Sequence, residues 1–96
     1  MKYSEFEKKI NALGDKYSVR FDEYFVKVYY HGEEVGRIVT NMPFNIVMHN
    51  CHKIDWGSNQ LDGLCYTYCS QLAGTLVKNR GRLPKDIEPY QGRVII

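Results

Sequence analysis

Apolar side chains near the start of the chain recur with the spacing of one helical face. The positions that share this face are Tyr3, Phe6, Ile10 and Leu13. Side chains three or four positions apart meet on one side of an α-helix. Ser4 and Glu7 have the spacing of a capping box, and Gly14 can take the left-handed conformation that often ends a helix. The pattern therefore predicts a short helix over residues 3–13.

The apolar period changes from helical spacing to two after residue 15. Residues 17–21 alternate between apolar and polar side chains, and residues 24–30 are rich in aromatic and β-branched types. Residues 35–40 and 44–48 continue the alternation after two further breaks. Alternation of this kind is typical of strands with one buried face. We therefore expect four consecutive strands.

A tight turn over residues 31–34, with Gly32 at positive φ, is expected to join the second and third strands into a hairpin. Two registers are open. A loop of two or four residues puts the valines at 26 and 28 on one face with those at 35 and 39. A loop of three residues puts them instead with Gly36 and Ile38. Because side chains alternate with a period of two, the choice decides which residues are buried.

The longest helical pattern lies in the second half of the chain. Six positions share its apolar face: Leu61, Leu64, Cys65, Tyr68, Leu72 and Leu76. Ser58 or Asn59 can cap the start of this helix, and Gly81 can end it. The apolar residues 94–96 are expected to dock as a last strand or a core plug.

These elements predict an α+β protein with the order α-β-β-β-β-α-β. We expect a small twisted antiparallel sheet of three to five strands, with one short N-terminal helix and one long helix packed on one face. A length of 96 residues suits one domain over 1–96. No apolar run is long enough to cross a membrane, and no secretory signal is visible. The expected location is the cytoplasm.

The charge balance excludes two classes of protein and leaves one basic segment. A net charge of +2 fits neither a highly acidic nucleic-acid mimic nor a strongly basic chromatin-type protein. The basic segment contains Lys78, Arg80, Arg82 and Lys85. It is either the solvated end of the long helix or a surface for phosphate contacts. The second interpretation makes the protein a small nucleic-acid-binding regulator.

Cysteine and histidine residues form a candidate metal site. His49, Cys51 and His52 lie in one loop, and Cys65 and Cys69 are four positions apart on the long helix. Two thiolates on one helical face suit zinc chelation, and the loop could supply further ligands. Buried cysteine also behaves as a small apolar residue. We favour the second interpretation, which requires no cofactor, and keep a zinc-stabilised interaction module as an alternative.

Enzymatic motifs are missing from the sequence. It contains no nucleotide-binding glycine loop, no zinc-protease motif and no nucleophile-elbow motif. Cys51 adjoins His52, but a catalytic pair needs spatial rather than sequential proximity. We therefore expect a protein that is not an enzyme.

Aromatic residues supply the candidate partner-binding surface. The candidates are Tyr24, Tyr29, Tyr30 and Trp56. Tyrosine and tryptophan are enriched at protein interfaces, where they act as anchors. The competing interpretation is cross-strand aromatic packing and, for Trp56, anchoring of its own loop.

Short motifs at both ends of the chain resemble a known group of proteins. The chain begins with Lys2-Tyr3-Ser4-Glu5-Phe6, continues with Lys9-Ile10 and Leu13-Gly14, and has Thr75 and Arg80 five positions apart. It resembles small accessory proteins of bacteriophages and prophages of Gram-positive bacteria. These have a Tyr-Ser-Glu-Phe helix, a β-meander and an amphipathic helix that often ends in Thr-x-x-x-x-Arg. Where they often have Thr-Pro, this chain has Thr75-Leu76.

The resemblance implies a phage accessory protein of undefined biochemical role, located in the cytoplasm of a host cell, and it supplies no catalytic residues. Together with the missing enzymatic motifs and the aromatic candidates, it leads us to expect a non-enzymatic protein that acts by protein–protein interaction on an unidentified host or phage protein. The resemblance alone suggests a host factor, including a component of a defence system, as the target. A second copy of the chain is a further candidate partner, because an exposed sheet edge can pair with another strand.

Overall fold

The computed structural model describes residues 1–49, 54–84 and 87. Two α-helices are present, α1 (Tyr3–Asn11) and α2 (Gln60–Ala73). Between them lie the strands β1 (Tyr17–Phe21), β2 (Phe25–Tyr30), β3 (Glu33–Val39) and β4 (Ile46–Met48). A short 3₁₀ helix, η1 (Val77–Asn79), follows α2. The predicted α+β class is confirmed. The strand or plug expected at residues 94–96 falls outside the described part of the chain.

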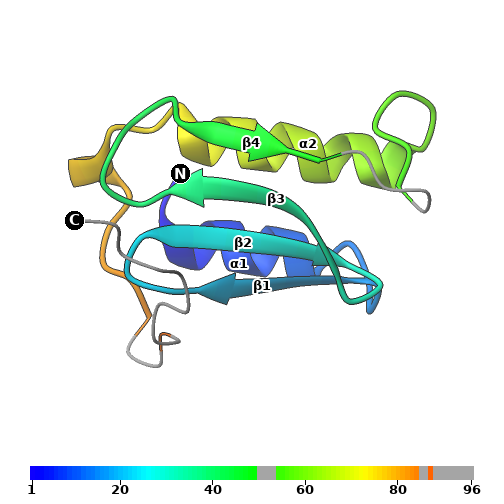
Figure 1. Cartoon of the computed structure of the whole chain (residues 1–96), viewed down its shortest axis with the longest axis horizontal. Coiled ribbons are helices and arrows are strands. Elements are labelled where there is room, and N and C mark those ends of the chain that lie inside the picture. Colours follow the sequence, from blue (N-terminus) through cyan, green and yellow to red (C-terminus); the bar gives the residue numbers. More distant parts are fainter. Residues whose placement is uncertain (50–53, 85–86, 88–96) are drawn as a thin grey trace, which may run out of the picture.

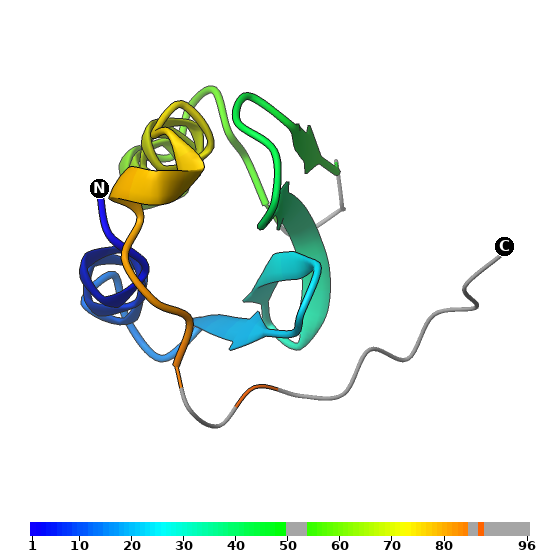
Figure 2. The same cartoon turned by 90° about the vertical axis from the view of Figure 1, so that its left-hand side faces the viewer.

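The four strands form one antiparallel sheet in chain order, β1-β2-β3-β4 (Figure 1). Both α-helices lie on the same side of this sheet (Figure 2). Helix α1 packs on β1, α2 packs on β3 and β4, and the two helices contact each other. The core therefore fills the space between a helical layer and the inner face of the sheet, as expected for two packed layers. No helix in these ranges has the length and apolar character needed to cross a bilayer.

Helix α1 follows the predicted apolar face but is capped differently at its start. Tyr3, Phe6 and Ile10 are buried against the sheet. The N-cap is Lys2, whose backbone N–H donates to the Glu5 carboxylate at 3.2 Å. The capping box predicted at Ser4 and Glu7 was therefore wrong. The Glu5 carboxylate accepts the backbone N–H of the N-cap residue Lys2 instead, because the helix already starts at Tyr3, before the predicted cap at Ser4.

The β2–β3 hairpin has a two-residue turn formed by His31 and Gly32. Both residues have positive φ, at 50° and 79°, as a type I′ turn requires. This turn geometry matches the right-handed twist of the flanking strands. The predicted positive φ of Gly32 is confirmed.

A β-bulge in β3 then changes the register. The pairing shifts between Val28 and Tyr29, so that Val28 lies opposite Gly36 while Tyr29 lies opposite Glu34. Val35 is the extra residue, and both Val35 and Gly36 are buried. A Cβ on Gly36 would come within 2.7 Å of the Met48 sulfur. The assumption that loop length alone sets the register was wrong, because the extra residue at the bulge shifts the pairing of β2 with β3 by one position, two residues after the turn.

Helix α2 is shorter than predicted, and its buried face is rotated. Asn59 caps its start, since its side-chain oxygen accepts from Leu61 N at 3.0 Å and Asp62 N at 3.1 Å. The helix ends at Ala73, with Gly74 rather than Gly81 as its C-cap. Its buried residues are Asp62, Cys65, Cys69, Leu72 and Ala73. The predicted face was wrong at both ends, where Leu61 and Leu76 are exposed.

Asp62 explains part of this rotation. Its carboxylate accepts a hydrogen bond from the Tyr17 hydroxyl on β1 and another, at 2.8 Å, from the backbone N–H of Asp55. A buried carboxylate is tolerated when hydrogen bonds satisfy it. Burial and the bond to Asp62 raise the pKa of Tyr17 well above its usual value. The pair thereby connects the sheet layer to the helical layer.

Candidate interaction site

Arg80 is completely buried at one end of the molecule. Its guanidinium donates to four backbone carbonyls: Thr75 at 2.9 Å, Val39 at 2.7 Å, and Met42 and Ala73 at 3.2 Å each. The carbonyls of Ala73 and Thr75 lie at the C-terminus of α2, where the helix dipole favours a positive charge. We call Arg80 and these four carbonyls the Arg80 clamp.

The Arg80 clamp joins segments that are far apart in sequence. It connects the end of β3, the β3–β4 loop and the end of α2. The backbone carbonyl of Arg80 also accepts from Tyr3 N at 2.8 Å, at the start of α1. The N-terminal amine of Met1 donates to Thr75 Oγ1 at 3.0 Å. The two motifs that carry the phage resemblance, Tyr3 onwards and Thr75 to Arg80, therefore meet in space.

This placement corrects the prediction of a four-residue basic surface. Arg80 is inside the protein, where its donors are taken by carbonyls, so it is not accessible to phosphate. Lys78 and Arg82 are exposed, and Lys85 lies outside the described ranges. Lys2, which the sequence pattern did not single out, joins them: its side chain would lie 3.8 Å from a Cβ on Gly81.

Four exposed apolar residues lie on segments at this end of the molecule, and we call these four residues the end patch. Its members are Tyr24, Met42, Phe44 and Leu76. They come from the β1–β2 turn, the β3–β4 loop and the segment after α2, which all lie at the left of Figure 1. Backbone bonds hold two of these segments: Thr40 N donates to Tyr24 O at 2.8 Å, and Phe44 N donates to Ala73 O at 2.7 Å.

Phe44 is the most unusual residue of the end patch. The residue is 74% exposed, and its φ is +57°. A bulky residue at positive φ is a conformational outlier, and such strain persists only where surrounding structure enforces it. The bond from Phe44 N to the Ala73 carbonyl provides that enforcement. The fold therefore holds a strained backbone in a position that displays an aromatic ring to solvent.

Sequence reasoning assigned Phe44 a different role. The alternation of Phe44 with Ile46 and Met48 predicted a strand whose apolar side faces the core. Strand β4 begins only at Ile46, and the two half-buried positions are Ile46 and Met48. Pro43 just before Phe44 was the available signal that the strand starts later, since proline commonly marks turns.

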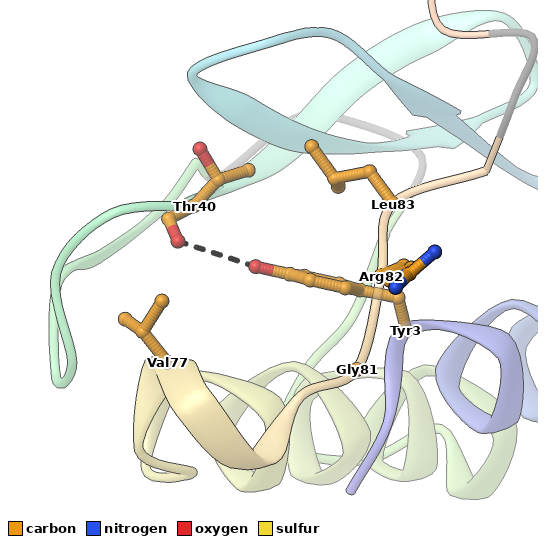
Figure 3. A pocket seen from close by; sticks show the side chains of 6 residues that line it. All are labelled: Tyr3, Thr40, Val77, Gly81, Arg82 and Leu83. Carbon is orange, nitrogen blue, oxygen red and sulfur yellow. Dashed lines mark hydrogen bonds between the residues drawn. The ribbon is translucent and has the colours of Figure 1, made fainter.

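A hollow of about 330 Å³ opens beside the end patch (Figure 3). Tyr3, Thr40, Val77, Gly81, Arg82 and Leu83 line it. The Tyr3 hydroxyl donates to Thr40 O at 3.2 Å, and Thr40 Oγ1 donates to Glu23 O at 2.6 Å. Because these polar atoms are already paired inside the protein, the hollow suits an apolar group, with Arg82 available for an anion.

The four predicted partner-binding aromatics do not lie together. Tyr24 is on the end patch, while Tyr29 is half-buried on the sheet. Tyr30 is buried and packs on Tyr17, with ring centroids 5.1 Å apart, so it does not belong to an exposed partner-binding surface. Trp56 is half-buried and donates to His49 O at 3.4 Å. The packing of Tyr30 supports the competing interpretation for this residue, in which aromatic side chains pack across the strands of the sheet.

The predicted metal ligands are also separated or lie outside the described ranges. Cys65 and Cys69 are buried on α2, while His49 is exposed and its Nε2 lies 3.8 Å from a Glu34 oxygen. A hydrogen bond to Cys65, together with burial, raises the pKa of the Cys69 thiol, which opposes the thiolate form that metals bind. Cys51 and His52 belong to the part that is not described. Among the described residues, no three potential ligands come together.

A comparison with known proteins found no relative of this chain. No family model, no curated protein and no solved structure matches it.

Proposed function

We propose that this protein is a non-enzymatic interaction protein that binds a partner protein through the end patch. Phe44 carries this proposal. The residue is 74% exposed and has a strained backbone, an arrangement that costs the fold free energy and returns little burial. Aromatic side chains, phenylalanine included, are enriched in protein–protein interfaces. Met42 and Leu76 supply further apolar area at the same end.

The surroundings of the end patch favour an acidic partner with an apolar anchor. Lys78 and Arg82 are exposed near the hollow, and Lys2 lies against Gly81. The hollow accepts an apolar side chain, and these cations attract carboxylates at its rim. The resemblance to phage accessory proteins extends the proposal: the partner is a host protein, including one that serves in defence.

Affinity capture with a matched control tests the proposal. The baits are the wild-type protein, Phe44→Asn and Leu61→Asn, used on a nuclease-treated lysate of a Gram-positive bacterium. Leu61 is a suitable control because it is an exposed apolar residue at the start of α2, away from the end patch.

The expected result is a protein that wild type and Leu61→Asn retain and Phe44→Asn loses, as judged by quantitative mass spectrometry. Retention of the same proteins by all three baits would contradict a role for the end patch. The folding of each bait is checked first by circular dichroism, so that a loss reflects the surface rather than the fold.

A further inference from the structure

The solvent-facing side of helix α2 carries no charged residue. No Asp, Glu, Lys or Arg occurs between Asp62, which is buried, and Lys78, which follows the helix. The exposed residues on this side are Gln60, Tyr66, Thr67, Ser70, Gln71 and the C-cap Gly74. We call these residues the α2 face. The outer side of a surface helix normally carries charged as well as polar side chains, so this face is unusual.

Helix α1 provides a comparison within the same molecule. The two helices lie on the same side of the sheet and contact each other (Figure 2). The exposed residues of α1 include Glu5, Lys8 and Lys9. Among the described elements, α2 contacts only α1, β3 and β4, and none of these covers its exposed side. The lack of charge is therefore a property of α2 itself rather than of the whole helical layer.

Two hydroxyl groups of the α2 face already have partners within the helix. Thr67 Oγ1 donates to Gly63 O, and Ser70 Oγ donates to Tyr66 O, each at 3.0 Å. A polar group that keeps its hydrogen bond costs little to bury, whereas one that loses its partner costs much more. No ion has to be desolvated at this face either. The α2 face can therefore be covered without leaving these hydroxyl donors unpaired.

Tyr66 supplies aromatic contact area on the α2 face. The residue is 44% exposed, and its ring packs edge-on against Trp56 with the ring centroids 5.6 Å apart. Tyrosine is enriched at protein interfaces. Because Trp56 already supports the ring, Tyr66 has less conformational freedom to lose when a second surface covers it.

We propose that the α2 face binds the same face of a second copy of this chain, with the two α2 helices antiparallel. In a two-fold contact, a residue near the symmetry axis lies close to its own image. A charged residue there would meet a like charge, which opposes association. A different partner is commonly guided by complementary charge, and the α2 face offers none. An uncharged face therefore suits a second copy, with Thr67 and Ser70 nearest the axis.

Sedimentation velocity of the purified full chain tests this proposal. We expect a reversible equilibrium between monomer and dimer with a Kd of roughly 10–300 µM, because a contact with little apolar area lies at the weak end of protein interfaces. Since no charge drives the contact, the Kd is expected to change less than about threefold between roughly 50 and 500 mM salt.

Charged variants of Ser70 locate the contact. Ser70→Glu and Ser70→Lys are each expected to weaken the dimer about tenfold or more, because each places like charges near the axis. An equimolar mixture of the two variants is expected to restore dimers, since opposite charges then meet. Ser18→Glu adds the same charge at an exposed position of β1 and is expected to change the Kd less than about twofold. Circular dichroism checks that each variant is folded, and Thr67→Glu with Thr67→Lys replaces any Ser70 variant that is not.

Three outcomes would overturn the proposal. The first is a monomer at every concentration up to about 500 µM, well above the expected Kd. The second is a dimer that Ser70→Glu leaves intact, as pairing through a sheet edge would give. The third is a pair of oppositely charged variants that stay apart when mixed, which would exclude a two-fold contact at Ser70. Because Ser70 lies outside the end patch, none of these outcomes bears on the capture experiment with Phe44→Asn.

Discussion

At the scale of single residues, Arg80 organises the end of the molecule. Its buried guanidinium bonds to four carbonyls from three segments. A buried charge is stable only while such bonds satisfy it, and the carbonyls in turn depend on the donors. Thr75 and Arg80 are part of one structural clamp, which gives their spacing in the sequence a physical meaning.

Replacement of Arg80 is predicted to be severely destabilising. Arg80→Met keeps much of the side-chain volume but leaves buried carbonyls without donors, so the free energy of unfolding is expected to fall by about 3–5 kcal/mol. Urea denaturation measures the change. Arg82→Met, at an exposed position, is the control and is expected to stay within about 0.5 kcal/mol of wild type. If Arg80→Met does not fold, Arg80→Lys is measured instead, and its free energy of unfolding is expected to lie between that of wild type and zero. A free energy of unfolding in Arg80→Lys equal to that of wild type would contradict the structural role of the Arg80 clamp.

Phe44 should respond to substitution through its backbone rather than its side chain. Asparagine tolerates positive φ, so Phe44→Asn is expected to leave stability unchanged or raise it by up to about 1 kcal/mol. Phe44→Val places a β-branched residue at the same φ and is expected to lower stability by about 1 kcal/mol. Thermal unfolding followed by circular dichroism distinguishes the two. Equal destabilisation by both variants would show that the ring itself supports the fold.

At the scale of elements, the β2–β3 hairpin combines a two-residue turn with a bulge. The turn requires positive φ at both of its residues, and the bulge then admits Val35 to the core beside Gly36. Strand positions could be predicted from alternation because a half-buried strand must alternate. The bulge could not, because the gain from burying two neighbouring residues depends on what packs against them.

Gly32 provides a direct test of the turn. A Cβ at this position would meet no atom within 4 Å, so any effect of Gly32→Ala comes from its φ of 79°. We expect a loss of about 1 kcal/mol in the free energy of unfolding. Gly57→Ala is the control, because a Cβ there makes only an ordinary contact of 3.8 Å with Asp55. A loss of the same size in both variants would point to general glycine effects instead.

At the scale of the whole molecule, the Tyr17–Asp62 pair connects the sheet to α2 and makes stability depend on pH. Burial first, and the bond to Asp62 second, raise the pKa of Tyr17. The folded protein thus holds this proton more tightly than the unfolded chain, whose tyrosine titrates near pH ~10. The contribution is fully present below that pH and is lost as the pH rises above it.

Tyr17→Phe is therefore expected to change both the level and the slope of stability. At neutral pH the variant should lose about 1–3 kcal/mol, because Asp62 loses a buried donor. Between about pH 9 and 11 its stability should fall less steeply than that of wild type. Urea titrations at a series of pH values measure both effects. Tyr24→Phe, at an exposed position, controls for removal of one hydroxyl, and an identical alkaline slope in Tyr17→Phe and wild type would contradict the prediction.

The sequence by itself determined the element order from α1 to α2, the α+β class and the buried face of α1, because burial of one face imposes a period on each helix and strand. It named Tyr24 among the candidate partner-binding aromatics but left open which of them are exposed. Only the tertiary structure decided the register after the bulge, the rotation of α2 around Asp62, the burial of Arg80 and the display of Phe44. Each of these depends on hydrogen bonds or packing between segments distant in sequence, and local periodicity carries no information about such partners.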